Sequence, residues 1–201
     1  MNLTAAWVRL CQAARFDNND YFAALSEAYT RNSLAYHNLA HIEDCLLKYQ
    51  KFSHLAHDPL AVEFAIWFHD IVYDPKARNN EEQSAVVAKE FLRGHALADS
   101  VAELILATRH QEPLGSLDAQ LICDIDLSIL GSDSPTYHIY AEAIREEYAW
   151  VAPDDYKIGR AKVLEDFLSR PRIYQHAEFR KKYERQARLN LKEELNSLSP
   201  A

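Results

Sequence analysis

The sequence predicts an all-α fold, a single helical bundle that spans residues 1–201. The chain has 201 residues, 48% of them hydrophobic, which is enough to bury one sizeable core. It contains only four glycines, and long stretches rich in Ala, Leu, Glu, Lys and Arg favour helix over sheet. No Asn-Gly or Asp-Gly pair, the strongest short signal of a hairpin, occurs anywhere.

The first half of the chain has helical spacing of its apolar residues, interrupted by polar segments. Asp58 followed by Pro59 is typical of a cap and a first helical residue. The run LAVEFAIWFHD after them is nearly all apolar, as expected of a buried central helix. The helices predicted before this run cover Leu3 to near residues 16–19, then 20–29, then 39–49.

The second half continues the helical pattern. Asn80 and Gln83 are predicted to cap the helix SAVVAKEFL, and Asp99 with Ser100 to begin the next one. Ser134 is predicted as a cap with Pro135 at the first helical position. The last helices are predicted over residues 137–150, 154–168 and 177–195.

Charge and cysteine content exclude several function classes. A formal net charge of −8 argues against a nucleic-acid or anionic-membrane surface as the main partner. Cys11, Cys45 and Cys123 are far apart and odd in number, which fits a reducing compartment and no disulfide framework. The N-terminus lacks an uninterrupted apolar core of a signal peptide, and no run of about 18 apolar residues occurs. We therefore expect a cytoplasmic protein.

Three short stretches carry metal-competent side chains: YHNLAHI at residues 36–42, FHD at 68–70 and DIDLS at 124–128. In the first, two histidines four residues apart would share one face of a helix. They can share a metal ion, divide metal binding from proton transfer, or simply pack. Imidazoles and carboxylates together suit a divalent ion, with Mn, Mg, Fe, Co, Ni and Zn as candidates. A His directly followed by Asp can converge on one ion only where the backbone turns, as at the end of the apolar helix.

The order His, His-Asp, Asp across a helical chain resembles the HD-domain superfamily of metal-dependent phosphohydrolases. YHNLAHI resembles a signature of cyclic-nucleotide phosphodiesterases, in which the first histidine donates a proton and the second binds metal. The stretches FHDIVYDP, NEEQSA, ATRHQ, DLSILG, IREEY and ARLNLKEEL resemble small stand-alone bacterial proteins identified as members of the HD superfamily. This likeness extends over nearly the whole chain and implies an HD-type helical domain.

The resemblance implies a role for each matching residue. His37 becomes the general acid, and Leu34 stands where the family has an arginine two positions before the tyrosine. The implied metal ligands are His41, His69, Asp70 and Asp126.

Other polar residues are candidates because of the chemistry that a phosphohydrolase needs. Glu82, beside Glu81, can orient the attacking water, and Asp70 serves both metal and catalysis. Cys45 is interpreted as a small core residue. The candidate contacts for substrate phosphate are Lys76, Arg109, His110 and Arg145.

These residues predict hydrolysis of a phosphate ester or anhydride by metal-activated water. The expected partner is a small phosphorylated substrate, most simply a nucleotide. Two alternatives remain: a nucleotide-binding regulator with a low-activity site, and a di-iron oxygenase, for which only His95 and His110 lie between the His-Asp pair and Asp126. A purely structural metal site would be closed by its ligands.

Overall fold

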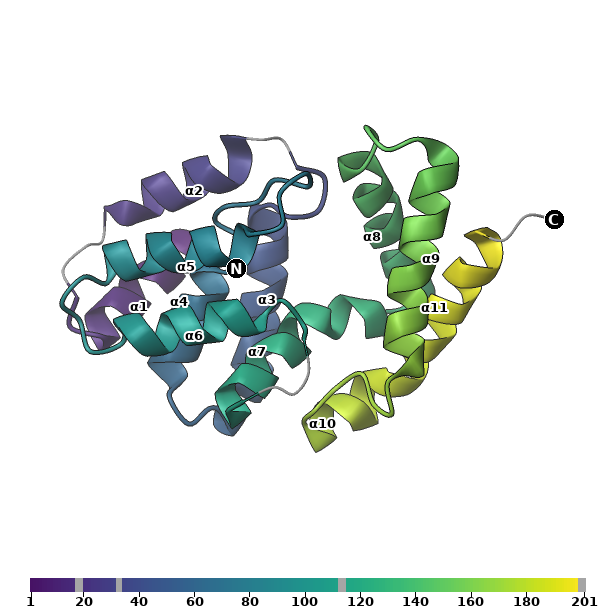
Figure 1. Cartoon of the computed structure of the whole chain (residues 1–201). Helices are drawn as coiled ribbons and strands as arrows, with labels where there is room; N and C mark the ends of the chain where they lie inside the picture. Colours follow the sequence, from purple (N-terminus) through teal and green to yellow (C-terminus); the bar gives the residue numbers. More distant parts are fainter. Residues whose placement is uncertain (17–19, 32–33, 112–114, 199–201) are drawn as a thin grey trace. The chain divides into compact units, whose positions relative to one another are not determined.

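The computed structural model describes residues 1–16, 20–31, 34–111 and 115–198, and these residues form helices joined by loops (Figure 1). They contain no β-strand, so the prediction of an all-α protein is confirmed. None of the helices in this part of the chain combines the length and the apolar character that a membrane span requires.

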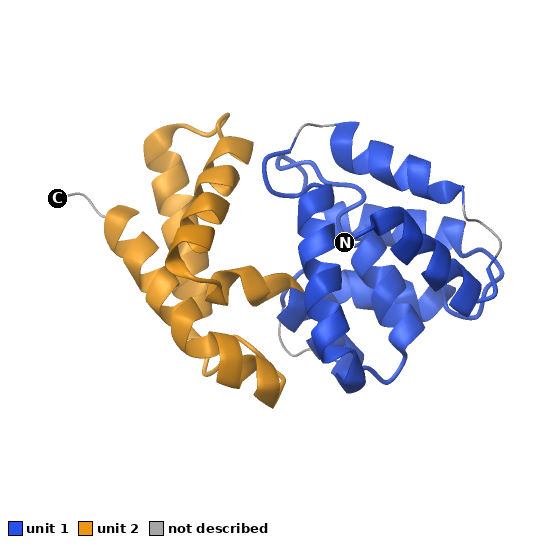
Figure 2. Cartoon of the chain, turned by 180° about the vertical axis from the view of Figure 1, so that it is seen from behind, with its two compact units in different colours: residues 1–125 blue, residues 126–201 orange. Residues whose placement is uncertain are grey.

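The chain divides into two compact units, residues 1–125 and residues 126–201 (Figure 2). The expectation of one domain over the whole chain stays a prediction, and each unit is described by itself.

The first unit is built around a buried central helix, α4. Apart from Glu63, this helix consists of apolar residues, and it contacts α1, α3, α5 and α6. Trp7 of α1 packs edge-on against Trp67 and Phe64 of α4, with ring centroids 5.6 and 6.0 Å apart. The elements of this unit are α1 (Leu3–Ala13), α2 (Tyr21–Arg31), α3 (Leu39–Phe52), η1 (Ser53–Leu55), α4 (Pro59–Phe68), α5 (Asn80–Phe91), α6 (Ala98–Ala107) and α7 (Leu117–Asp126), whose last residue already belongs to the second unit.

The start of α4 is as predicted, because the Asp58 side chain accepts a hydrogen bond from the Ala61 amide at 3.0 Å and Pro59 is the first helical residue. The predicted first helix ends at Ala13, earlier than expected, and residues 17–19 lie outside the described residues.

The predicted capping pair Asn80 and Gln83 is wrong. Helix α5 begins at Asn80 itself, and its cap position, Asn79, makes no side-chain capping bond. Asn80 instead closes the preceding loop: its side chain accepts from the Asp74 amide and donates to the Asp74 carbonyl, both at 3.0 Å. Helix α6 begins at Ala98, just before the expected Asp99.

The second unit is a smaller helical assembly in which α11 packs against α9 and η2. The buried Asn190 side chain donates to the carbonyls of Leu130 and Ser132, at 2.8 and 2.9 Å, and so fixes α11 to the C-terminal end of η2. The elements are η2 (Leu127–Gly131), α8 (Ser134–Glu147), α9 (Pro153–Ser169), α10 (Ala177–Phe179), the π-helical η3 (Arg180–Glu184) and α11 (Arg185–Leu198).

Two predictions for this unit need correction. Asp133, not Ser134, caps α8, because its carboxylate accepts from the Thr136 amide at 2.9 Å. The last predicted helix, 177–195, contains a π-helical turn and is therefore not one regular α-helix.

Candidate metal centre

Helix α3 positions His41 in its first turn. The Asn38 side chain caps this helix by accepting from the Ala40 amide at 2.9 Å, so the helix begins at Leu39. His37 therefore precedes the helix, and the expectation that His37 and His41 share one helical face is wrong. Their ring centroids still lie 6.0 Å apart.

His37 is held by a stacking contact rather than by the helix. Its ring lies on the ring of Tyr73, with centroids 3.7 Å apart and an interplanar angle of 14°. Tyr73 lies in the loop between α4 and α5, and this loop is tied to α5 because the Ser84 hydroxyl accepts from the Val72 amide and donates to the Val72 carbonyl, both at 3.2 Å. The half-buried His37 ring is thus placed beside His41 by two different segments.

The end of α4 presents His69 and Asp70. Helix α4 stops at Phe68, and its last turn is anchored by the Tyr29 hydroxyl, which donates to the Trp67 carbonyl at 2.9 Å. The His69 Nδ1 lies 3.0 Å from the Ile66 carbonyl oxygen, an acceptor, so Nδ1 carries the proton in this contact. The Nε2 atom of His69 is then left with the lone pair that a metal ligand needs.

Three donor atoms converge at this point. The Nε2 atoms of His41 and His69 lie 3.2 Å apart, and Asp70 Oδ2 lies 3.2 Å from His69 Nε2 and 3.5 Å from His41 Nε2. Metal–nitrogen and metal–oxygen bonds of about 2.1 Å place two ligands of one ion roughly 3.0–3.5 Å apart, for angles from octahedral to tetrahedral. The triangle therefore has the dimensions of a three-ligand metal site.

Burial and charge also favour an ion here. His41 and His69 are only 5% and 2% exposed. Burial raises the pKa of Asp70, but without an ion the positive charge of doubly protonated His69 and the hydrogen bond from its Nε2, with smaller effects of His37 and His41, outweigh it and lower the pKa to about 2. A bound ion would take the place of that Nε2 proton. The Asp70 carboxylate is thus ionised and available as a ligand.

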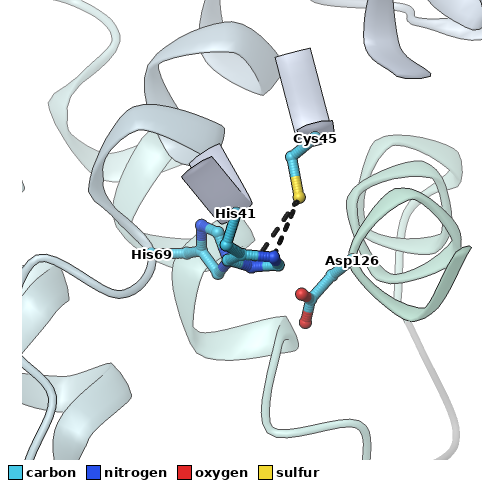
Figure 3. A group of neighbouring side chains, drawn as sticks. All are labelled: His41, Cys45, His69 and Asp126. Carbon is cyan, nitrogen blue, oxygen red and sulfur yellow. Dashed lines mark hydrogen bonds between the residues drawn. The ribbon is translucent and has the colours of Figure 1, made fainter. Parts of the chain in front are cut away.

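Two further side chains have donor atoms close to the imidazoles. Single donor atoms of His41, Cys45, His69 and Asp126 all lie within 4.8 Å of one another, so this group can bind a metal ion (Figure 3). Asp126 is the last residue of α7, and its placement follows from that helix, whose other residues belong to the first unit.

Cys45, which the sequence predicts to be a small core residue, also lies beside these donor atoms. The residue is 2% exposed, as expected of a core residue, but its sulfur lies 3.7 Å from His41 Nε2. The signal that can find it is its spacing: Cys45 follows His41 by four residues on α3 and so lies on the same helical face.

The predicted water-orienting and phosphate-binding residues Glu82 and Arg109 are paired with each other. The Arg109 guanidinium contacts the Glu82 carboxylate, and its Nε lies 4.0 Å from Glu81 Oε2. His110 follows in the left-handed region, with a φ of 56°. The charge of Arg109 is thus already opposed by two carboxylates.

The other two residues predicted to contact substrate phosphate, Arg145 and Lys76, have different surroundings. Arg145 donates to the carbonyls of Tyr148 and Val151, at 2.7 and 3.2 Å, and its guanidinium lies over the Tyr156 ring. These contacts close the C-terminal end of α8. Lys76 is exposed, and its backbone amide donates to the Asp74 carboxylate at 2.9 Å.

In comparisons with known proteins, no family model, no curated protein and no solved structure matches this chain.

Proposed function

We propose that the protein is a metal-dependent phosphohydrolase of the HD type, which cleaves a phosphate ester or anhydride of a small substrate, most simply a nucleotide. The observation that carries this proposal is the triangle of His41 Nε2, His69 Nε2 and Asp70 Oδ2, with sides of 3.2–3.5 Å. The motif order that predicts the HD superfamily supports it, and Asp126 is the fourth ligand on that reading.

The residues divide the work of hydrolysis. When bound, a divalent ion supplies Lewis acidity and lowers the pKa of a coordinated water. His41, His69 and Asp70 would hold the ion, and the burial of His41 and His69 would keep bulk water away on their side of it. Together with Asp126 these three ligands would occupy four positions of a six-coordinate ion such as Mg²⁺ or Mn²⁺ and leave two for water and substrate, unlike a closed structural site.

His37 is the general acid in this proposal. Its ring lies beside His41 but is held apart by stacking on Tyr73, so it can give a proton to the leaving oxygen without binding the ion. Histidine suits this step because its pKa lies near neutrality.

The test is release of phosphate or nucleotide from a panel of phosphorylated substrates, with Mn²⁺, Mg²⁺, Co²⁺, Ni²⁺ and Zn²⁺ assayed separately. We expect metal-dependent turnover that His69→Ala abolishes together with metal binding. The matched control is His54→Ala, which removes an exposed histidine from η1 and leaves turnover intact. Absence of turnover with every ion, although the protein binds the ion, contradicts the proposal.

His37→Ala tests the proposed division of labour. We expect kcat to fall by about 10²–10⁴-fold, the usual contribution of a general acid, with metal content unchanged. Loss of the metal in this variant would instead make His37 a ligand.

A nucleotide-binding regulator is the second candidate. It is favoured by Leu34, which stands where the HD relatives have an arginine, and by the pairing of Arg109 with Glu82, which leaves fewer cations for a phosphate. Nucleotide binding that depends on His69 but yields no product over hours would select the regulator over the hydrolase.

A further inference from the structure

We propose that Cys45 is a ligand of the metal centre, and that the site binds a thiophilic ion such as Zn²⁺ through the Cys45 thiolate together with His41 and His69. This ligation would close the coordination sphere and inhibit the enzyme. The inhibition rests on the proposed hydrolase function, whereas the ligation itself does not.

The distances fit one ion. A metal–sulfur bond of about 2.3 Å and a metal–nitrogen bond of about 2.1 Å, at a tetrahedral angle, place the two donors roughly 3.6 Å apart. Cys45 Sγ lies 3.7 Å from His41 Nε2, and His41 Nε2 lies 3.2 Å from His69 Nε2. His41 Nε2 is therefore at ligand spacing from both the sulfur and the second imidazole.

The helix makes this spacing stable. His41 and Cys45 are one turn apart on α3, and both are buried, at 5% and 2% exposure. Residues four apart on a helix project side by side, so the pair can chelate one ion without a change in the backbone. Figure 3 shows the sulfur directed toward the His41 ring.

The other two cysteines have different surroundings. Cys123 donates to the Ala107 carbonyl at 3.1 Å, which is an ordinary setting for a buried thiol. Cys11 lies in the core of the first unit on α1, fully buried. The sulfur of Cys45, in contrast, lies close to the imidazole nitrogens of His41 and His69. The carboxylate of Asp126 belongs to the same group of donor atoms.

The two imidazoles lie close to both a hard donor, the Asp70 carboxylate, and a soft donor, the Cys45 sulfur. Asp70 Oδ2 lies 3.2 Å from His69 Nε2, and carboxylate oxygen suits Mg²⁺ or Mn²⁺. Thiolate suits Zn²⁺ and Cd²⁺, and the thiol proton passes to solvent when the ion binds. His41, His69, the Cys45 thiolate and the Asp126 carboxylate would fill the four positions of zinc, so no position would remain for water. The identity of the ion would therefore decide whether the centre is open.

The test is titration of the full-length protein with Co²⁺, which reports sulfur ligation by its absorption spectrum. We expect a thiolate-to-cobalt charge-transfer band in the near ultraviolet, and its loss in Cys45→Ser with the visible d–d bands retained. Cys123→Ser is the matched control and keeps the band. Bound Co²⁺ without a charge-transfer band in the native protein, or a band unchanged in Cys45→Ser, overturns the proposal.

A second measurement needs no variant. X-ray absorption at the zinc edge of the native protein should show a sulfur scatterer at about 2.3 Å, apart from nitrogen and oxygen at about 2.0–2.1 Å. A zinc shell made only of nitrogen and oxygen contradicts ligation by Cys45.

Inhibition is measured separately from ligation. With Mn²⁺ supporting turnover, we expect Cys45→Ser to need at least tenfold more Zn²⁺ for half-inhibition, because loss of even a residue that only supports a ligand weakens metal binding by about 10–100-fold. If the charge-transfer band is present but no substrate is turned over, ligation by Cys45 is supported and the hydrolase proposal is contradicted. If substrate is turned over but the band is absent, the hydrolase proposal is supported and ligation by Cys45 is contradicted.

Discussion

Glu63 is a partly buried carboxyl group on the central helix α4, between the buried residues Val62 and Phe64. Burial raises its pKa from 4.5 to about 7, although the positive charge of Arg9 acts in the opposite direction. Because the folded-state pKa is the higher one, the folded protein binds the proton more tightly than the unfolded chain does. The stability that this proton contributes is complete below about pH 4.5 and is lost as the pH rises through about 7.

We therefore expect Glu63→Gln to stabilise the protein at pH 8 but to have little effect near pH 4. The expected gain at pH 8 is on the order of 1–2 kcal/mol, less than the full shift implies because the residue is partly exposed to solvent. Urea denaturation at the two pH values measures it, with Glu103→Gln on the exposed face of α6 as a control for the loss of one charge. Equal stabilisation at both pH values would show that the carboxyl group is ionised throughout.

At the same scale, the sequence identifies the side chains of the candidate centre better than their geometry. His41, His69 and Asp70 could be named from the order of the motifs, and the structure places their donor atoms 3.2–3.5 Å apart. The position of the Cys45 sulfur beside the imidazoles was not predicted, although the spacing of four residues from His41 on one helix is consistent with it. The stacking of His37 on Tyr73 joins segments 36 residues apart, and no local pattern predicts such a contact.

At the scale of elements, η2 and η3 pack closely against each other at Gly131. A Cβ atom built on Gly131 would lie 2.6 Å from Tyr183 Cβ and 2.8–2.9 Å from the Tyr183 carbonyl oxygen and Cα. Two of these three atoms are backbone, so no rotation of a side chain can relieve the clash. The π-helical turn that carries Tyr183 is thus packed directly on the glycine.

Gly131→Ala should destabilise the second unit by about 1–3 kcal/mol, the typical cost of overpacking that forces the backbone to move. Gly159→Ala is the matched control, because it lies on α9 with no atom within 4 Å of the added methyl group. The control should instead be stabilising by up to about 1 kcal/mol, through helix propensity. Chemical denaturation followed by circular dichroism compares the two variants, and equal stabilities would show that η3 moves without cost.

The helix boundaries show where sequence reasoning about elements holds. Asp58 was correctly predicted as a cap, because Pro59 after it leaves few other conformations. Asn80 was wrongly predicted, because its side chain can bond either the helix start or the loop, and it bonds Asp74 in the loop. The π-helical turn within residues 177–195 was missed, since the sequence RKKYE has ordinary helical spacing and its close packing on Gly131 is not local.

At the scale of the whole molecule, each unit has its own buried core. Trp7 and Trp67 are fully buried in the first unit, whereas Trp150 of the second unit is 53% exposed. In the second core the large aromatic residues Tyr174 and Phe179 are fully buried. Change in tryptophan fluorescence on unfolding therefore reports mainly on the first unit, which contains His41, His69 and Asp70.

Binding of a metal ion should raise the unfolding temperature of that unit, because an ion held by a folded site stabilises the folded state by mass action. At a free concentration of 100 times Kd the gain is about 2.7 kcal/mol. For a protein of this size it corresponds to a rise of roughly 5–10 °C. Thermal unfolding followed by tryptophan fluorescence, with and without Mn²⁺, measures the shift.

His69→Ala should remove the shift, because it deletes a donor 3.2 Å from both His41 Nε2 and Asp70 Oδ2, whereas His54→Ala should retain it. A shift of the same size in His69→Ala would place the ion elsewhere on the molecule and would withdraw the support for the candidate centre.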